Sequence, residues 1–296
     1  MGRIFTYEEI ADQRYPAEAD FSNALQAFND LAPQAIKNGW LDGAFVFGSV
    51  ASWILKGNVK VSARSDFDIA LALADDRGLP NYDAAKQFIS DIRKSSAGLI
   101  PIIPIIQPKR ALEDAMHEMD RYFGQHLRSE FRKVHGNDPA GYITFPNESA
   151  HGILLSYLTA KRRRLVNALM APDALDLSEG NGIQRMLELA AAVGRKVLQA
   201  YVEAGYLEEH ISNSADKVGL IARAQTLFDS EGVGEGFGGL VKMDTKYNEL
   251  FADTVAGNVT HGEYYSEIMG LHAQLPHAIN WINAVEQCVL PKLAAG

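Results

Sequence analysis

The sequence predicts an α/β domain over residues 1–146, with a small mixed sheet flanked by helices, followed by an all-α helical bundle over residues 147–296. Three observations predict this arrangement. In the first half, short apolar runs alternate with amphipathic stretches, which is typical of strands alternating with helices. After Ser149 the apolar residues recur almost entirely at helical spacing. A length of 296 residues also suits two domains.

The first predicted elements lead to a glycine-serine pair. Residues 20–38 have the periodicity of a helix, which Pro33 is expected to split because proline lacks the backbone N–H. Residues 44–47 are continuously apolar and predict a buried strand. This strand ends at Gly48-Ser49, and a short helix over residues 50–55 is expected to begin at that turn.

The remaining elements of the first half continue the alternation. Pro101 and Pro104 cannot donate to a sheet ladder, so the strand that contains them is expected at a sheet edge. Residues 109–135 are expected to be helical, with a break at Gly124. The elements expected before these are a strand over residues 66–73, an amphipathic helix over 82–95 and the proline-containing strand over 99–107.

The second half has the pattern of a helical bundle. The breaks between its periodic segments are rich in Gly, Asn and Ser, as at residues 178–182 and 232–239. Its last segment is expected to be split at Pro276. The expected helices cover residues 149–170, 182–204, 216–229, 238–255 and 261–292.

Composition narrows the class of protein. The net charge is -9, from 28 basic and 37 acidic residues, which argues against a long nucleic-acid substrate because such binding depends on Lys and Arg neutralising phosphates. No segment approaches the ~20 apolar residues that cross a bilayer, and the N-terminal residues lack the apolar run of a signal peptide. The single cysteine, Cys288, cannot form an internal disulfide. We therefore expect a cytoplasmic protein without a membrane partner.

Two aspartates are the first candidate for chemistry. Residues two apart on a strand point to the same face, so Asp66 and Asp68 are expected to project together. Two adjacent carboxylates repel each other unless a positive charge lies between them. Mg2+ suits this position because it prefers oxygen ligands and often bridges carboxylates to substrate phosphates. The alternative for such a pair taken alone is a solvated strand end.

Gly48 and Ser49 supply the complementary half of the expected site. Glycine allows a close approach of the backbone to a phosphate, and a turn that leads into a helix directs free N–H groups at an anion. The hydroxyl of Ser49 adds another donor. A phosphate cradle beside a carboxylate pair is what metal-assisted nucleotidyl transfer requires.

The strand followed by Gly48-Ser49, and the later strand that opens on Ser-Asp-x-Asp, resemble the DNA polymerase beta-type nucleotidyltransferase superfamily. The motif covers roughly residues 44–73, and the helical second half resembles the arrangement in aminoglycoside nucleotidyltransferases. The resemblance implies that Gly48 and Ser49 contact a nucleoside triphosphate, with ATP expected. It also implies that Asp66 and Asp68 are catalytic and bind Mg2+, with Mn2+ as the alternative. A nucleoside monophosphate would pass to an acceptor hydroxyl with release of pyrophosphate.

Three further residues are candidates for nucleotide binding. Arg64 and Ser65 come directly before the aspartate pair, and the alternative for Arg64 is an ordinary loop charge. Lys161 begins the densest basic run of the chain, residues 161–164, and a lysine of the helical domain near the triphosphate would suit the resembled family. On a helix these four residues fan over every face, so a solvated position is the alternative for Lys161.

The sequence departs from the resembled family in two ways. Sixteen residues, 50–65, separate Ser49 from Asp66, which is longer than the usual gap. The family also places a third carboxylate on a later strand, whereas residues 99–107 contain no acid. The residues that could replace it are Glu113, Asp114, His117 and Glu118 after that strand, or Glu148 and Glu188 in the helical half.

Three functions stay open at this point. A nucleotidyltransferase acting on a small molecule is favoured. The absent third carboxylate favours a second possibility, a catalytically weakened nucleotide-binding regulator or antitoxin-like protein. The third is a transferase that modifies a protein, a tRNA or a second nucleotide.

Overall fold

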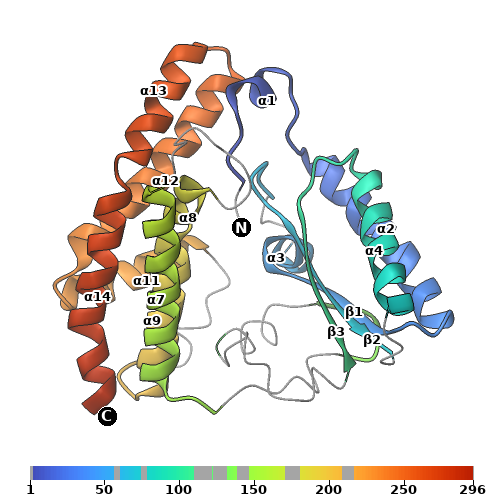
Figure 1. Ribbon diagram of the computed structural model, residues 1–296, viewed down its shortest axis with the longest axis horizontal. Coiled ribbons are helices and arrows are strands. Elements are labelled where there is room, and N and C mark those ends of the chain that lie inside the picture. Colours follow the sequence, from blue (N-terminus) through green and yellow to red (C-terminus); the bar gives the residue numbers. More distant parts are fainter. Residues whose placement is uncertain are drawn as a thin grey trace. The chain divides into compact units, whose positions relative to one another are not determined.

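The computed structural model describes residues 3–56, 61–74, 79–109, 122, 132–138, 147–170, 181–208 and 217–295. The chain divides into two compact units, which Figure 1 shows as ribbons. One unit comprises Tyr15–Asn147, and the other comprises Glu148–Gly296 together with Gly2–Arg14.

The first unit contains a mixed sheet with the strand order β3-β2-β1-β4. Strand β1 pairs antiparallel with both β2 and β4, whereas β2 pairs parallel with β3. Parallel neighbours need a crossover connection, and helix α4 (Leu79–Ser95) provides it. The strands are β1 (Leu41–Phe47), β2 (Phe67–Leu73), β3 (Ile102–Pro108) and β4 (Arg132–Gly136). The predicted small mixed sheet flanked by helices is therefore confirmed.

Helices α2 (Glu18–Lys37) and α4 lie together on one side of this sheet (Figure 1). Phe28 of α2 is fully buried, and its ring centroid lies 6.2 Å from that of Phe67 on β2 and 5.9 Å from that of Phe88 on α4. The same core includes Ile69, Leu71 and Leu73, which are alternate residues of β2. One face of β2 is thus committed to the core, and its intervening residues, beginning with Asp68, belong to the other face.

Pro33 does not split helix α2, contrary to the expectation from the sequence. The helix runs without a break from Glu18 to Lys37. A proline in a helix interior costs about 3 kcal/mol, yet the helix continues through it, with its apolar face, including Phe21, Phe28 and Ala32, buried in the core. Packing against the sheet therefore overrides the local preference.

Residues 132–135 form a strand, so the expected helix over residues 109–135 is wrong at its end. Strand β4 pairs with β1, where Gly43 lies opposite Gly136. Gly136 has a φ of +70°, and a Cβ on Gly43 would lie 2.0 Å from the Asn137 carbonyl oxygen, so this crossing requires glycine. The rest of the expected helix, apart from Lys109 and Tyr122, is outside the described residues. Pairing with the distant strand β1 therefore determines the structure of residues 132–135.

Strand β3 lies at the edge of the described sheet, as its prolines predict. Pro104 pairs in register with Ile69 of β2 and is exposed. The short helix predicted after Gly48-Ser49 is present as α3 (Gly48–Lys56), which begins at Gly48 itself.

The second unit is helical, as predicted. The expected helix over residues 182–204 is divided at Glu188, and the expected helix over 261–292 is divided at residues 273–274. Pro276 consequently lies in the first turn of the last helix, where a missing N–H costs no hydrogen bond. The helices are α1 (Tyr7–Ala11), α7 (Ala150–Leu169), α8 (Gly182–Leu187), α9 (Leu189–Glu203), α11 (Lys217–Ser230), α12 (Gly234–Val255), α13 (His261–His272) and α14 (Leu275–Ala295).

An aromatic cluster forms part of the core of this unit. The ring centroids of Phe228 and Phe237 are 4.9 Å apart, and that of Trp281 lies 5.4 Å and 5.8 Å from them. The indole Nε1 of Trp281 donates to the Val233 carbonyl at 3.1 Å. A Cβ on Gly236 would lie 2.6 Å from the Trp281 ring, so a glycine permits this packing.

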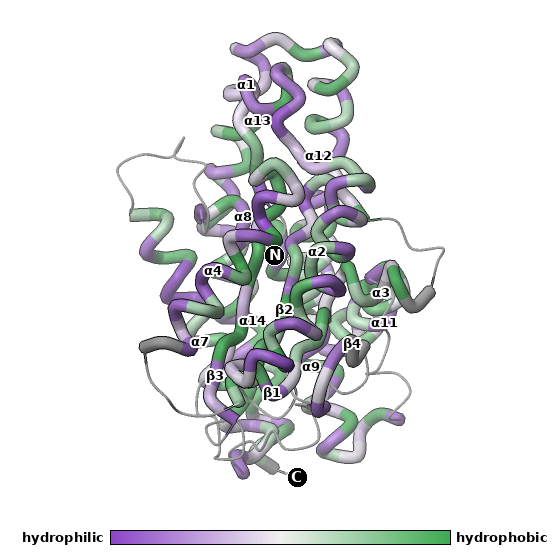
Figure 2. The backbone as a smooth tube through the Cα atoms, turned by 90° about the vertical axis from the view of Figure 1, so that its right-hand side faces the viewer, coloured by the Kyte–Doolittle hydropathy of each residue, from purple (hydrophilic) through white to green (hydrophobic). Residues whose placement is uncertain are grey.

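The helices alternate between hydrophilic and hydrophobic residues along their length (Figure 2), and no helix in the described ranges is both long and apolar enough to cross a membrane.

The N-terminal segment packs against α12 and α13 of the helical unit. The backbone N–H of Phe5 donates to the Tyr247 hydroxyl at 3.0 Å, and the Tyr264 hydroxyl donates to the Phe5 carbonyl. Burial raises the pKa of Tyr264, which keeps its hydroxyl protonated and able to donate. The domain boundary expected from the sequence assigns these first residues to the α/β domain, whereas their contacts lie in the helical unit.

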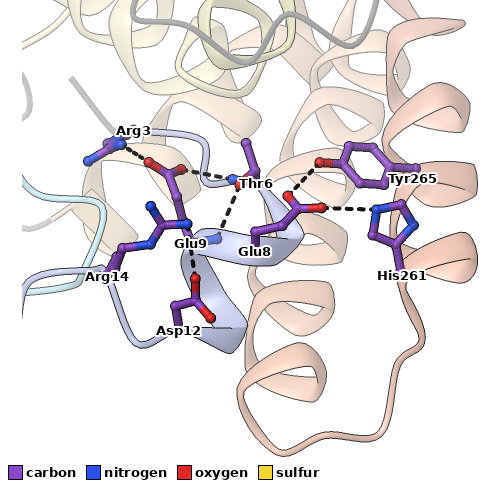
Figure 3. A network of polar contacts seen from close by, with 8 residues as sticks. All are labelled: Arg3, Thr6, Glu8, Glu9, Asp12, Arg14, His261 and Tyr265. Atoms are coloured by element: carbon purple, nitrogen blue, oxygen red, sulfur yellow. Dashed lines mark hydrogen bonds and ion pairs between the residues drawn. The ribbon is translucent and has the colours of Figure 1, made fainter.

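A second set of polar contacts holds the short helix α1 (Figure 3). The Tyr265 hydroxyl donates to Glu8 Oε2 at 3.1 Å, and His261 Nε2 lies 2.9 Å from Glu8 Oε1. Thr6 caps the helix and exchanges hydrogen bonds with Glu9 in a capping box. The first turn of α1 is therefore attached to α13 through Glu8.

We expect Tyr264→Phe to lower the free energy of unfolding by about 1–3 kcal/mol, because it leaves the buried Phe5 carbonyl without this donor. Tyr265→Phe, one residue along the same helix, removes an exposed contact and should cost less than about 0.5 kcal/mol. Urea unfolding measures both costs, and hydrogen exchange over residues 3–11 should accelerate only in the Tyr264 variant. Equal effects of the two variants would contradict this assignment.

Candidate functional site

The end of β1 and the start of β2 lie together at one edge of the sheet. The antiparallel register places Phe47, the last residue of β1, opposite Asp68. Gly48 follows at once with a φ of +71°, in the left-handed region, and begins α3. The register therefore brings the Gly48-Ser49 turn beside the aspartate pair, although sixteen residues separate them in sequence.

The carboxylate of Asp68 lies directly over Gly48. A Cβ built on Gly48 would be 2.2 Å from Asp68 Oδ2 and 3.2 Å from its Cγ. A side chain at residue 48 would require the Asp68 carboxylate to move, and the left-handed backbone also favours glycine. The contact is local evidence that the turn and the aspartate form one structural feature.

Asp66 and Asp68 have different environments. Asp66 is 3% exposed, whereas Asp68 is partly exposed. Burial is the main cause that raises the pKa of Asp66, and attraction to a positive charge of the chain itself is the largest cause that lowers it. A hydrogen bond also joins the Asp66 carboxyl group to the Asp68 side chain. Adjacent carboxyl groups are stabilised by a shared proton or by a nearby positive charge. Phe67 lies between the two aspartates in the sequence. Its backbone N–H donates to the Pro101 carbonyl at 2.9 Å, which connects the start of β2 to the segment before β3.

The other candidate residues of the first unit precede the aspartate pair in the sequence. Ser49 is exposed in the first turn of α3. Ser65 has a local structural role, because its Oγ accepts the Ser62 N–H at 3.1 Å while its own N–H donates to the Ser62 carbonyl at 2.9 Å. Arg64 is partly buried in the same turn. The turn over residues 62–65 therefore leads the chain into Asp66.

Lys161, the remaining candidate for nucleotide binding, belongs to the helical unit. Its Nζ lies 5.2 Å from the centroid of the Tyr157 ring, and the Nζ of Lys196 lies at the same distance from that centroid. Burial lowers the pKa of Lys161. Sequence reasoning missed Lys196 and Tyr157, although Lys196 interrupts a mainly apolar helical stretch and Tyr157 precedes Lys161 by one helical turn.

The register of β3 shows which side chains share the sheet face of Asp68. Ile103 lies opposite Asp68, followed by Ile105 and Gln107 at alternate positions. This row contains no acid. In the described ranges no group of three or more His, Cys, Asp or Glu residues is arranged to hold a metal ion. Of the expected replacements, Glu113, Asp114, His117 and Glu118 lie outside the described residues, and Glu148 and Glu188 belong to the helical unit.

The chain was compared with protein-family models, with curated proteins and with solved structures, and none of them matches it. The geometry of the site combines a left-handed glycine, an exposed serine in the first turn of a helix and a pair of adjoining carboxyl groups.

We expect Gly48→Ala to destabilise the protein more than Gly39→Ala does. Both glycines are left-handed, with φ of +71° and +75°, but nothing lies within 4 Å of a Cβ on Gly39. Gly39→Ala should therefore cost only the backbone strain, about 1–2 kcal/mol. Gly48→Ala adds the clash with the Asp68 carboxylate. Urea unfolding of both variants measures the difference.

The same change made in an Asp68→Ala background separates the two contributions. The carboxylate is then absent, and the new methyl group meets the Cβ of residue 68 at 3.5 Å, an ordinary contact. The cost of Gly48→Ala should then fall to that of Gly39→Ala. An unchanged cost in this background would show that the Asp68 carboxylate does not lie over Gly48.

Proposed function

We propose that this protein is a Mg2+-dependent nucleotidyltransferase that transfers a nucleoside monophosphate from a nucleoside triphosphate, with ATP expected, to a hydroxyl of a small acceptor molecule. The observation that carries the proposal is the approach of the Asp68 carboxylate to Gly48 at the junction of β1 and α3, with Asp66 beside it. A phosphate-binding turn next to paired carboxylates is the combination that this reaction needs.

The turn supports binding of a triphosphate. The first backbone N–H groups of a helix have no partner within that helix and are directed at the space before it. Helix α3 begins at Gly48 immediately after a strand, which is a favourable position for a phosphate. Ser49 is exposed and adds a hydroxyl donor. Ser65, Arg64 and, from the helical unit, Lys161 remain proposed contacts of the nucleotide.

The aspartate pair suits a hard divalent cation. Mg2+ is commonly held by one or two carboxylates together with substrate phosphates, and Asp66 and Asp68 supply two adjoining carboxyl groups. When bound, Mg2+ or Mn2+ would neutralise negative charge on the phosphate oxygens during an in-line displacement. The contribution of the protein is then to position the triphosphate and the acceptor and to hold the two carboxylates in place.

The net charge of -9 supports a small acceptor over a long nucleic acid. Long nucleic acids are bound through many Lys and Arg contacts to phosphates, and acidic residues outnumber basic residues by 37 to 28 in this chain. This argument concerns the class of acceptor and leaves its identity open.

A second function is favoured by one observation, the apolar row on β3. Because Ile103, Ile105 and Gln107 occupy the sheet positions beside the aspartate face, no acid of β3 can deprotonate an acceptor hydroxyl. A catalytically weakened protein that binds nucleotide with Mg2+ and acts as a regulator or antitoxin-like protein would have such a site.

One experiment separates the two functions. Each of the four nucleoside triphosphates is tested with Mg2+ for thermal stabilisation and for pyrophosphate release in the presence of a panel of hydroxyl-bearing small molecules, including aminoglycosides. A transferase releases pyrophosphate, whereas a regulator is stabilised by the nucleotide without release. Absence of both responses would contradict both proposals.

We expect Asp68→Asn to reduce Mg2+-dependent pyrophosphate release by at least about 100-fold, as for loss of a main electrostatic contact to the reacting group. Asp91→Asn is the matched control, because it makes the same chemical change on α4, where Asp91 interacts with Gln87 and Lys94. The control should keep the activity of the parent protein. Full activity in the Asp68 variant would refute the proposed role of the pair.

A further inference from the structure

The sheet positions on both sides of Asp68 are apolar. Phe47 of β1 lies opposite Asp68 on one side, and Ile103 of β3 lies opposite it on the other. Residues paired in register on neighbouring strands project to the same face, and the strands are about 4.8 Å apart. Among the described strands, Asp68 is therefore an acid with an apolar side chain beside it on each side.

The apolar character continues along the same sheet face. Ala70, the next residue of β2 on this face, has Phe45 of β1 and Ile105 of β3 opposite it. The row on β3 ends at Gln107, which lies opposite Ala72. Alternate residues of a strand are about 6.6 Å apart, so the apolar part of this face is long enough for a ring-sized molecule.

The two sides of this face differ in burial. Phe45 and Phe47 are 0% and 6% exposed, so the β1 side is covered. Ile103 and Ile105 are instead partly exposed. Neither belongs to the core that the sheet forms with α2 and α4, although that core includes Ile102 of the same strand. The β3 side is therefore an apolar surface that this core does not use and that a ligand can contact.

The chemistry of this surface limits its ligand. The side chains of Ile103 and Ile105 neither accept hydrogen bonds nor neutralise charge, so an ammonium group placed against them would lose hydration without compensation. Small-molecule sites are mostly apolar, with a few polar groups that orient the ligand. Here Asp68 lies at one end of the row and the partly exposed Gln107 at the other. A neutral molecule with an apolar body and few polar groups fits this pattern.

We propose that Ile103 and Ile105 form the acceptor-binding surface, and that the acceptor is a neutral molecule whose apolar body carries the reacting hydroxyl. The inference rests on the proposed nucleotidyl transfer. In that reaction the acceptor oxygen bonds to the α-phosphorus, the bond from this phosphorus to the pyrophosphate oxygen breaks, and the hydroxyl proton passes to water. The acceptor must therefore lie beside the aspartate pair, and the partly exposed sheet neighbour of Asp68 is Ile103.

The first test needs no turnover. Binding of the neutral alcohol 2-naphthaleneethanol to the full-length protein is measured by isothermal titration calorimetry in buffer that contains EDTA. The double variant Ile103→Thr/Ile105→Thr should weaken binding about tenfold, because it removes apolar contact area from the ligand. Threonine retains the β-branch that favours a strand, and thermal unfolding checks that the variant is folded. If the double variant does not fold, the two single variants provide the test.

Pro104→Thr is the matched control for this measurement. Pro104 is an exposed residue of the same strand, and it pairs in register with Ile69, whose side chain belongs to the opposite face. The control should bind 2-naphthaleneethanol with the affinity of the parent protein. An equal loss of affinity in Pro104→Thr and in the double variant would overturn the inference, as would parental affinity in the double variant or absence of binding to the parent protein.

The second test uses pyrophosphate release with ATP and Mg2+. The parent protein should show a higher kcat/KM for 2-naphthaleneethanol than for the polycationic aminoglycoside kanamycin. The double variant should raise the KM for the alcohol about tenfold and leave kcat and the KM for ATP unchanged, as expected for loss of binding that is equal in the ground and transition states.

The two tests distinguish failure of the inference from failure of the proposed function. Pyrophosphate release with kanamycin but not with 2-naphthaleneethanol would support nucleotidyl transfer and overturn the apolar acceptor. Binding of the alcohol that depends on Ile103 and Ile105, without pyrophosphate release from any acceptor, would support the apolar site and refute the transfer reaction.

Discussion

The antiparallel register of β1 and β2 is the constraint on which the first unit depends. It places Phe47 opposite Asp68, so Gly48, the residue after Phe47, lies under the Asp68 carboxylate, where the left-handed backbone favours glycine. A slip of one residue would exchange the two faces of β2, turning Asp68 into the core and Phe67 out of it. Burial of Phe67 against Phe28 thus stabilises the register that forms the candidate site.

The same division of the sheet into two faces accounts for the burial of Asp66 and its position beside Asp68. Helices α2 and α4 cover the face of β2 that carries its larger apolar residues, which supplies the core of the unit. Asp66 and Asp68 are left adjoining, with Asp66 almost fully buried. Burying a carboxyl group beside another opposes stability, and such groups are common where a protein binds a cation or performs chemistry.

The helical unit also contains charged groups whose position opposes its stability. Its aromatic core is closely packed, and Gly236 permits contact with the Trp281 ring. Helices α7 and α9 instead bring two lysines, Lys161 and Lys196, to the same ring, that of Tyr157. Proteins commonly give up stability at sites that serve function. The two units therefore carry complementary chemistry, adjoining carboxyl groups in one and two lysines at one ring in the other.

The sequence by itself determined the features that depend on local periodicity and side-chain chemistry. These include the edge position of the proline-containing β3, the helix that begins after β1 and the helical second half. Tertiary structure decided what depends on partners distant in the chain. The uninterrupted α2 at Pro33, strand β4, the attachment of Phe5 to α12 and α13, and the meeting of Lys161 with Lys196 at Tyr157 are of this kind. Their cause is packing and long-range hydrogen bonding, whose free energy exceeds the local preferences that a sequence pattern displays.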